Sequence, residues 1–161
     1  MLLYHFTASE YLDSIMAEGL TRGEVPLSAT NFMNAVNLTS SPDSAGHGLS
    51  DSREFTPEER DWARRMNDGR LPDGPLRFLN KKAVRITVKI PRDDRNLVAW
   101  PKWARKHLAA DWYATLNKAA GGKANTWFLY WGVIPPTWFV KVEKRRETGE
   151  WSGYGRAGNR P

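Results

Sequence analysis

His5 is a candidate for ligand binding or acid/base chemistry. It lies within a mostly apolar segment of residues 1–7 whose residue types fit a β-strand. Side chains of a strand alternate between two faces, so His5 and Thr7 would share one face and Tyr4 and Phe6 the other. A histidine in such a strand needs a partner, because burying an unpaired polar group costs free energy. The sequence therefore predicts either a ligand-binding histidine or one whose hydrogen bonds are satisfied in the core or at an edge of the sheet.

His47 lies between Gly46 and Gly48, in a loop where the backbone can come close to a ligand. The loop lacks the lysine and the spacing of a phosphate-binding P-loop. Because the pKa of imidazole lies near neutral pH, His5 and His47 suit an acid/base pair for metal-free RNA cleavage. A zinc site is not expected, because the three histidines are widely separated and the chain has no cysteine.

Length and composition limit the possible classes of protein. A chain of 161 residues fits one domain, and the absence of cysteine suits a reducing cytosol, so a cytoplasmic protein is expected. No apolar run approaches the roughly 20 residues that cross a bilayer, and the start lacks the features of a signal peptide. The net charge of +6 favours acidic partners, nucleic acid first.

Several elements must position these histidines. A helix is predicted over residues 8–18, with Thr7 and Glu10 forming a capping box and Gly19 ending it. Residues 21–34, which include Glu24, lack periodicity and are expected to be an irregular connection. Residues 35–39 alternate and predict a second strand.

The rest of the chain gives two further helices and a late group of strands. Thr56 and Glu59 form a capping box for a helix that runs to about Met66, and Pro101 begins a helix to about residue 117. Strands are predicted over residues 83–90, 127–131 and 138–142, with a short apolar piece at 97–100. Helices and strands alternate early and strands cluster late, which favours a single α+β domain.

Residues 144–161 form a polar, Gly-rich tail with five basic and two acidic residues. The domain is therefore expected to span residues 1–143, followed by a tail that is either disordered or an arm that grips nucleic acid. Trp151 and Tyr154 interleave aromatic with basic residues, as single-strand binders do. The alternative is that Trp151 docks on the core.

Four stretches of the chain, in this order, resemble the ADP-ribosyltransferase-like superfamily in its histidine-containing branch, which also takes in RNA 2′-phosphotransferases and DNA-modifying toxins. They are residues 3–7 (Leu-Tyr-His-Phe-Thr), the helix end at 15–20, the strand at 35–40, and the aromatic strand and turn at 127–136. Together they comprise 27 of the 161 residues.

The resemblance implies a split mixed or antiparallel sheet that binds NAD and transfers ADP-ribose to an acceptor. By the resemblance, His5 hydrogen-bonds the ribose of NAD, with Thr7, Thr39 and Tyr130 also at the cofactor. The family's glutamate commonly precedes the aromatic strand, where this chain has Asn125 and Thr126.

A carboxylate normally stabilises the oxocarbenium-like state of this reaction. Glu24, Asp111 and Glu143 are the candidates for that role, with Glu24 and Glu143 preferred together with His5 as catalytic residues. The function expected is NAD-dependent ADP-ribosyl transfer to DNA, RNA or a protein bound to them. Two alternatives stay open: a nucleotide- or nucleic-acid-binding module without turnover, and the metal-free nuclease that uses His5 and His47.

Overall fold

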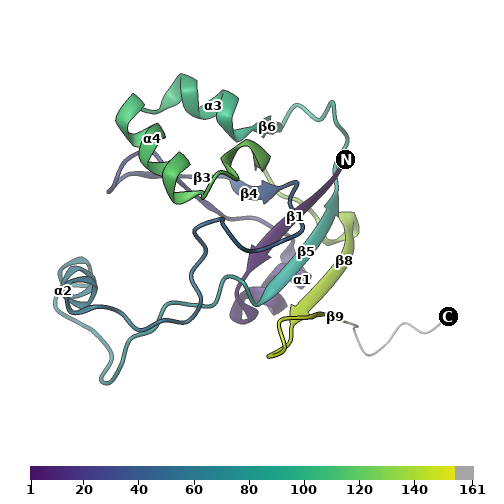
Figure 1. The fold of residues 1–161 in the computed structure, drawn as a ribbon. Helices are drawn as coiled ribbons and strands as arrows, with labels where there is room; N and C mark the ends of the chain where they lie inside the picture. Colours follow the sequence, from purple (N-terminus) through teal and green to yellow (C-terminus); the bar gives the residue numbers. More distant parts are fainter. Residues whose placement is uncertain (155–161) are drawn as a thin grey trace.

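Strand β1 (Leu2–Thr7) occupies the centre of the sheet in the computed structural model, which describes residues 1–154 (Figure 1). It pairs along its whole length with β5 (Val84–Lys89), with His5 opposite Ile86 and Phe6 opposite Arg85. Paired residues of antiparallel strands share a face. The predicted alternation is therefore confirmed: His5 lies on the face of the buried aliphatic residues, and Phe6 lies on the other.

Seven strands of the described residues form one sheet in the order β6-β7-β4-β1-β5-β8-β9, and all neighbours are antiparallel. The remaining strands of this sheet are β4 (Val36–Thr39), β6 (Leu97–Ala99), β7 (Trp127–Tyr130), β8 (Phe139–Arg145) and β9 (Trp151–Gly153). The single-domain α+β class predicted from the sequence is confirmed, and the sheet is antiparallel between all of its described strands.

Apolar side chains cover both faces of the sheet. Leu129 and Tyr130 are neighbours in β7 and point to opposite faces, where they belong to different buried clusters. The Tyr130 cluster includes Leu12 from the start of α1, and the Leu129 cluster includes Trp103 of α3. Each cluster therefore ties helical segments to its own side of the sheet.

Helix α1 (Leu12–Glu18) follows a short 3-10 turn at Ser9–Tyr11, and both segments lie within the predicted helix. The predicted capping box is wrong, because neither helix start has a side-chain cap. Thr7 is instead the last residue of β1, buried and paired with Val84. The end is as predicted, since Gly19 takes φ +90° and its N–H donates to the carbonyl of Ile15.

The helix predicted over residues 101–117 is two helices, α3 (Trp100–His107) and α4 (Ala110–Ala119). Leu108 breaks the helix with extended backbone and packs against the cluster that contains Trp103. The apolar contact of Leu108 with the core thus replaces helix continuation. Residues 21–34, predicted to be irregular, contain a small hairpin of β2 (Glu24–Pro26) and β3 (Phe32–Asn34).

Helix α2 (Pro57–Met66) begins as predicted. Thr56 accepts a hydrogen bond from the N–H of Glu59, and the Glu59 carboxylate accepts one from the N–H of Thr56. Figure 1 shows α2 standing away from the sheet, within the long connection between β4 and β5. We call residues 48–82, which carry α2, the lobe.

The predicted boundary after residue 143 falls inside strand β8, which continues to Arg145 and pairs with β9. Trp151 of β9 packs on the sheet, with its ring 6.0 Å from that of Phe6 and 4.5 Å from the guanidinium carbon of Arg85. Of the two readings of Trp151, the structure therefore supports the alternative, in which Trp151 docks on the core. Residues 155–161 of the predicted tail lie outside the described residues. Every helix within residues 1–154 is too short or too polar to span a bilayer.

Candidate functional site

A large cavity lies where β1 and β4 run side by side. β1 forms six residue pairs with β5 but only one with β4, Tyr4 with Thr39. The cavity has a volume of about 1020 Å³ and is lined by residues of both strands. We call it the central cavity. It extends from Tyr11, Ser14 and Glu18 of the α1 region to an aromatic end formed by Phe6, His47 and Trp127.

His5 spans the gap between the two strands. Its Nδ1 lies 2.9 Å from the backbone carbonyl oxygen of Asn37 in β4. A carbonyl only accepts, so Nδ1 carries the proton and donates it. Burial lowers the pKa of His5, an effect that the bond to Asn37 opposes and that the positive charge of Lys81 reinforces. At neutral pH the imidazole is therefore neutral, and its Nε2 is a hydrogen-bond acceptor.

Nε2 of His5 has no hydrogen-bond partner among residues 1–154, and His5 lines the central cavity while only half-buried. The geometry thus leaves one ring nitrogen available to a ligand. A hydroxyl group is the matching donor, because a neutral Nε2 accepts and does not donate.

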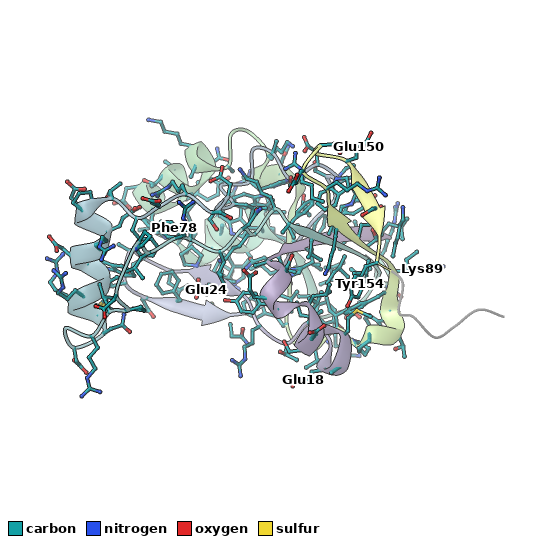
Figure 2. The ribbon with its side chains drawn as sticks, turned by 90° about the horizontal axis from the view of Figure 1, so that it is seen from below. Glu18, Glu24, Phe78, Lys89, Glu150 and Tyr154 are labelled. Atoms are coloured by element: carbon teal, nitrogen blue, oxygen red, sulfur yellow. The ribbon has the colours of Figure 1, made fainter. Side chains whose placement is uncertain are left out.

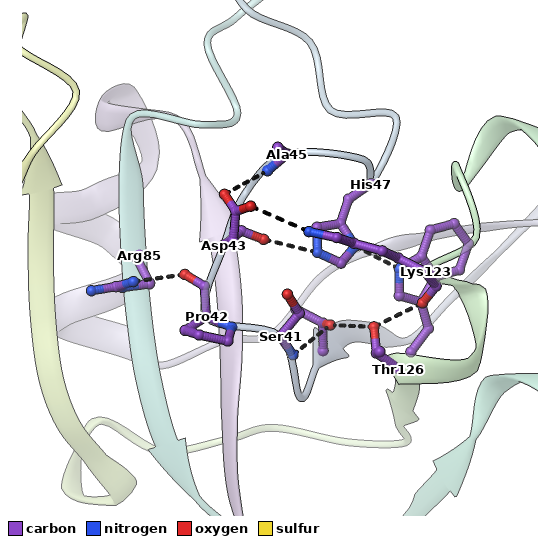
Figure 3. A network of polar contacts seen from close by, with 10 residues as sticks. Ser41, Pro42, Asp43, Ala45, His47, Arg85, Lys123 and Thr126 are labelled. Atoms are coloured by element: carbon purple, nitrogen blue, oxygen red, sulfur yellow. Dashed lines mark hydrogen bonds and ion pairs between the residues drawn. The ribbon is translucent and has the colours of Figure 1, made fainter.

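His47 also lines the central cavity, but both of its ring nitrogens are bonded within the protein (Figure 3). The indole N–H of Trp127 donates to Nδ1 at 2.7 Å, and Nε2 donates to the backbone carbonyl of Asp43 at 3.0 Å. Burial lowers the pKa of His47, as does Lys123, against the opposing effect of Asp43. The acid/base role considered for His47 would require one of these bonds to break.

Thr7 and Thr39 line the same cavity as His5 and are buried. The Thr126 hydroxyl donates to the carbonyl of Lys123 at 2.7 Å, so the Thr39 hydroxyl donates to Thr126 at 2.8 Å. Thr39 also accepts from the N–H of Ser41 at 3.1 Å. Thr39 therefore fixes the loop after β4 through its bonds with Thr126 and Ser41, the two partners that Figure 3 labels.

Tyr130 is the sequence-predicted cofactor residue that the structure places away from the cavity. It is buried in the cluster on the aliphatic face, and its hydroxyl donates to the Asp94 carboxylate at 3.3 Å. Its ring meets that of Trp138 edge to face. The structure does not bring Tyr130 together with His5.

The structure separates the two preferred carboxylates. Glu24 lies in β2 and lines the central cavity. Glu143 lies opposite Arg85, on the face away from His5, and is only 3% exposed. Arg85 contacts it at 2.9 and 2.7 Å and Lys141 at 2.7 Å. Burial raises the pKa of Glu143, but the bonds from Lys141 and Arg85 outweigh that effect and lower it.

Sequence reasoning missed Glu18, which lines the central cavity from the last turn of α1. Figure 2 labels it at the end of this purple helix. A signal existed, because a carboxylate at the C-terminal end of a helix is unfavourable for the helix dipole, and α1 has no basic residue there. The third carboxylate candidate, Asp111, is exposed on α4 and does not line the cavity.

Backbone shapes the rim of the central cavity at Gly19 and Gly23. A Cβ on Gly19 would lie 2.4 Å from the carbonyl oxygen of Ile134, and one on Gly23 would lie 2.2 Å from that of Ala35. Both contacts are with backbone, so neither position has room for a side chain. The strip between α1 and β2 is therefore fixed by main-chain packing.

What the site can do chemically follows from this arrangement. The central cavity offers one available imidazole acceptor, two carboxylates and an aromatic end. Within residues 1–154, no group of three or more His, Asp or Glu side chains is arranged to hold a metal ion. Comparisons with protein-family models, with curated proteins and with solved structures find no match for this chain.

Proposed function

We propose that the central cavity binds NAD and that this chain transfers ADP-ribose from it to nucleic acid or to a protein bound to nucleic acid. The observation that carries the proposal is His5, whose Nδ1 is held by Asn37 while its Nε2 is available to a ligand. The volume of about 1020 Å³ supports it, because small-molecule and cofactor sites commonly occupy roughly 300–1,000 Å³. The net charge of +6 supports an acidic acceptor.

Each group of the cavity has a role in this proposal. Nε2 of His5 accepts a hydrogen bond from a ribose hydroxyl and thereby orients the sugar. Phe6 and Trp127 provide flat apolar surface at the other end for an aromatic ring of NAD. Glu24 supplies negative charge to the ribose as positive charge develops on it.

The proposed reaction breaks the bond between C1′ of the ribose and the nicotinamide nitrogen. Nicotinamide leaves with the electron pair, which neutralises its ring. A lone pair of the acceptor forms the new bond to C1′, and the acceptor loses one proton to solvent. No oxidant or reductant is consumed.

The test is mass spectrometry of reactions with NAD, with single-stranded DNA, RNA and protein offered separately. We expect nicotinamide release, a mass gain of ADP-ribose on one acceptor, and a loss of roughly 100-fold in His5→Ala, because a substrate misplaced by about 1 Å can react about 10²-fold more slowly. His107→Ala is the matched control, because His107 is exposed on α3 and does not line the cavity. Folded His5→Ala protein that binds NAD as wild type does would overturn the proposal.

Two further variants separate the carboxylates of the cavity. Glu24→Gln keeps the shape of the side chain and removes its charge, and we expect nicotinamide release to fall by roughly 100-fold. Glu18→Gln is the matched change at the other carboxylate, with a smaller expected loss. NAD binding without nicotinamide release in the wild type would instead identify a binding module.

A further inference from the structure

A second cavity adjoins the central one at the base of the lobe. Its volume is about 470 Å³, and its walls come from residues 48–55 and 77–81. Gly48, Leu49 and Lys81 line both cavities. We call this space the side cavity. A ligand seated in it therefore lies next to whatever the central cavity holds.

Backbone pairing within the lobe holds the walls of the side cavity in place. The N–H of Phe55 donates to Leu76, the N–H of Phe78 to Arg53, and the N–H of Lys81 to Ser50. The rings of Phe55 and Phe78 stack with centroids 4.2 Å apart and an angle of 23° between planes. Figure 2 shows Phe78 between helix α2 and the rest of the molecule. The aromatic wall is thus pre-formed.

The charged side chains of this lining are cationic, Arg77 and Lys81, and no carboxylate contributes to it. Arg77 is ion-paired with Glu54. Lys81 is exposed and has no ion pair within residues 1–154, whereas its neighbour Lys82 pairs with Asp51 at 3.2 Å. Lys81 therefore carries uncompensated positive charge at the junction of the two cavities.

We infer that the side cavity binds a nucleotide of a single-stranded nucleic acid, with the base against the ring of Phe55, which stacks on Phe78, and a phosphate at Lys81. Proteins that bind single-stranded nucleic acid combine aromatic surface with cations, because each base has a face that can stack and each phosphate carries a negative charge. Bases inside a duplex are already stacked and cannot enter. This inference rests on the proposed function, because the role of the side cavity would be to present the acceptor strand to the central cavity.

The test is fluorescence anisotropy with mixed-sequence single-stranded DNA and RNA oligonucleotides labelled at one end, titrated over a range of salt. In Lys81→Ala we expect weaker binding and a slope of log K against log salt that is shallower by about 0.7, the value for one phosphate contact on a single strand. In Phe55→Leu, which keeps apolar volume but removes the ring, we expect roughly tenfold weaker binding with the slope unchanged.

Lys82→Ala is the matched control. It removes the same charge from the next residue in the chain, and Lys82 lines neither cavity. Circular dichroism verifies that each variant is folded. No binding by the wild type at low salt, or equal binding by Lys81→Ala, Phe55→Leu and wild type, would overturn the inference.

NAD binding and nicotinamide release are measured on the same proteins, so that the two proposals fail separately. Lys81→Ala and Phe55→Leu that lose the oligonucleotide but release nicotinamide like wild type support the acceptor site. If wild type neither binds NAD nor releases nicotinamide, the proposed function fails, and the strand-binding site is decided by the titrations alone.

Discussion

The central cavity holds two histidines that differ in how many of their ring nitrogens are bonded within the protein. His5 and His47 each donate one ring N–H to a backbone carbonyl, of Asn37 and Asp43 respectively. The other nitrogen of His47 accepts from Trp127 at 2.7 Å, whereas the other nitrogen of His5 has no partner in the described part of the chain. His47 is also the more buried, at 8% exposed.

This difference separates a structural histidine from one that is prepared for a ligand. A side chain whose polar atoms are all satisfied stabilises the fold and has nothing left to offer. A side chain anchored at one atom and unsatisfied at another is oriented in advance, and it reserves that atom for an incoming group. The two histidines therefore predict opposite responses to substitution.

The largest expected effect is on the stability of His47→Ala. The change removes two hydrogen bonds, leaves the Trp127 indole N–H unpaired and removes the ring contact with Phe6. We expect the free energy of unfolding to fall by about 3 kcal/mol, against about 1 kcal/mol for His5→Ala, which loses one bond. Urea unfolding at neutral pH measures both. Equal losses of stability in the two variants would show that His47 is no more structural than His5.

A smaller effect is expected for Trp127→Phe. Phenylalanine keeps an aromatic ring between His47 and Trp100, but it has no N–H to donate to Nδ1 of His47. We expect a loss of about 1 kcal/mol in the free energy of unfolding from the unpaired nitrogen. Trp112→Phe is the control, since the indole of Trp112 also donates a hydrogen bond, to the carbonyl of Pro26, away from either histidine. A larger loss of stability in Trp112→Phe would mean that the bond from Trp127 to His47 contributes no more than an ordinary indole hydrogen bond.

The smallest expected effect is on pH dependence. Burial lowers the pKa of both His5 and His47 below the ordinary value of 6.5, so the unfolded chain binds more protons than the folded one below that pH. Their contribution to stability is complete above pH 6.5 and is lost as the pH falls from there through the folded pKa values. Stability should therefore decline as the pH falls below about 6.5.

Carboxyl groups do not obscure this window. The bond from Arg53 lowers the pKa of Glu59 to about 2, and Glu143 is also lowered, so both lose their contributions only below the ordinary value of 4.5. Urea unfolding at several pH values compares wild type with His47→Ala. We expect a weaker decline in the variant, and an unchanged decline would exclude His47 as its source.

Much of the fold was predictable because local signals and tertiary packing agree. The alternation in β1 and β5 matches the faces that the sheet buries, and the capping box of Thr56 and Glu59 forms because both side chains are exposed enough to turn back on the helix start. Thr7 and Glu10 have the same residue types at the same spacing but form no capping box, because Thr7 is paired with Val84 in the sheet.

The site was less predictable, since it depends on which atoms remain unpaired after folding. The sequence singled out both histidines, but the bond from Trp127, 80 residues away in the chain, leaves His47 without an available ring nitrogen. Glu143 and Glu24 were equal candidates until strand pairing placed Glu143 on the opposite face, beside Arg85. Long-range partners of this kind leave no trace in residue spacing.

Gly19 and Gly23 carry an evolutionary consequence. Because backbone atoms of Ile134 and Ala35 leave no room for a side chain at either glycine, the outline of the rim there is set by main chain and not by side chains. Mutations at Tyr11 or Ser14 can therefore change which ligand is preferred without remodelling the cavity that receives it. Selection acting on such a chain can alter its specificity in single steps, while almost every substitution at the two glycines is expected to be eliminated.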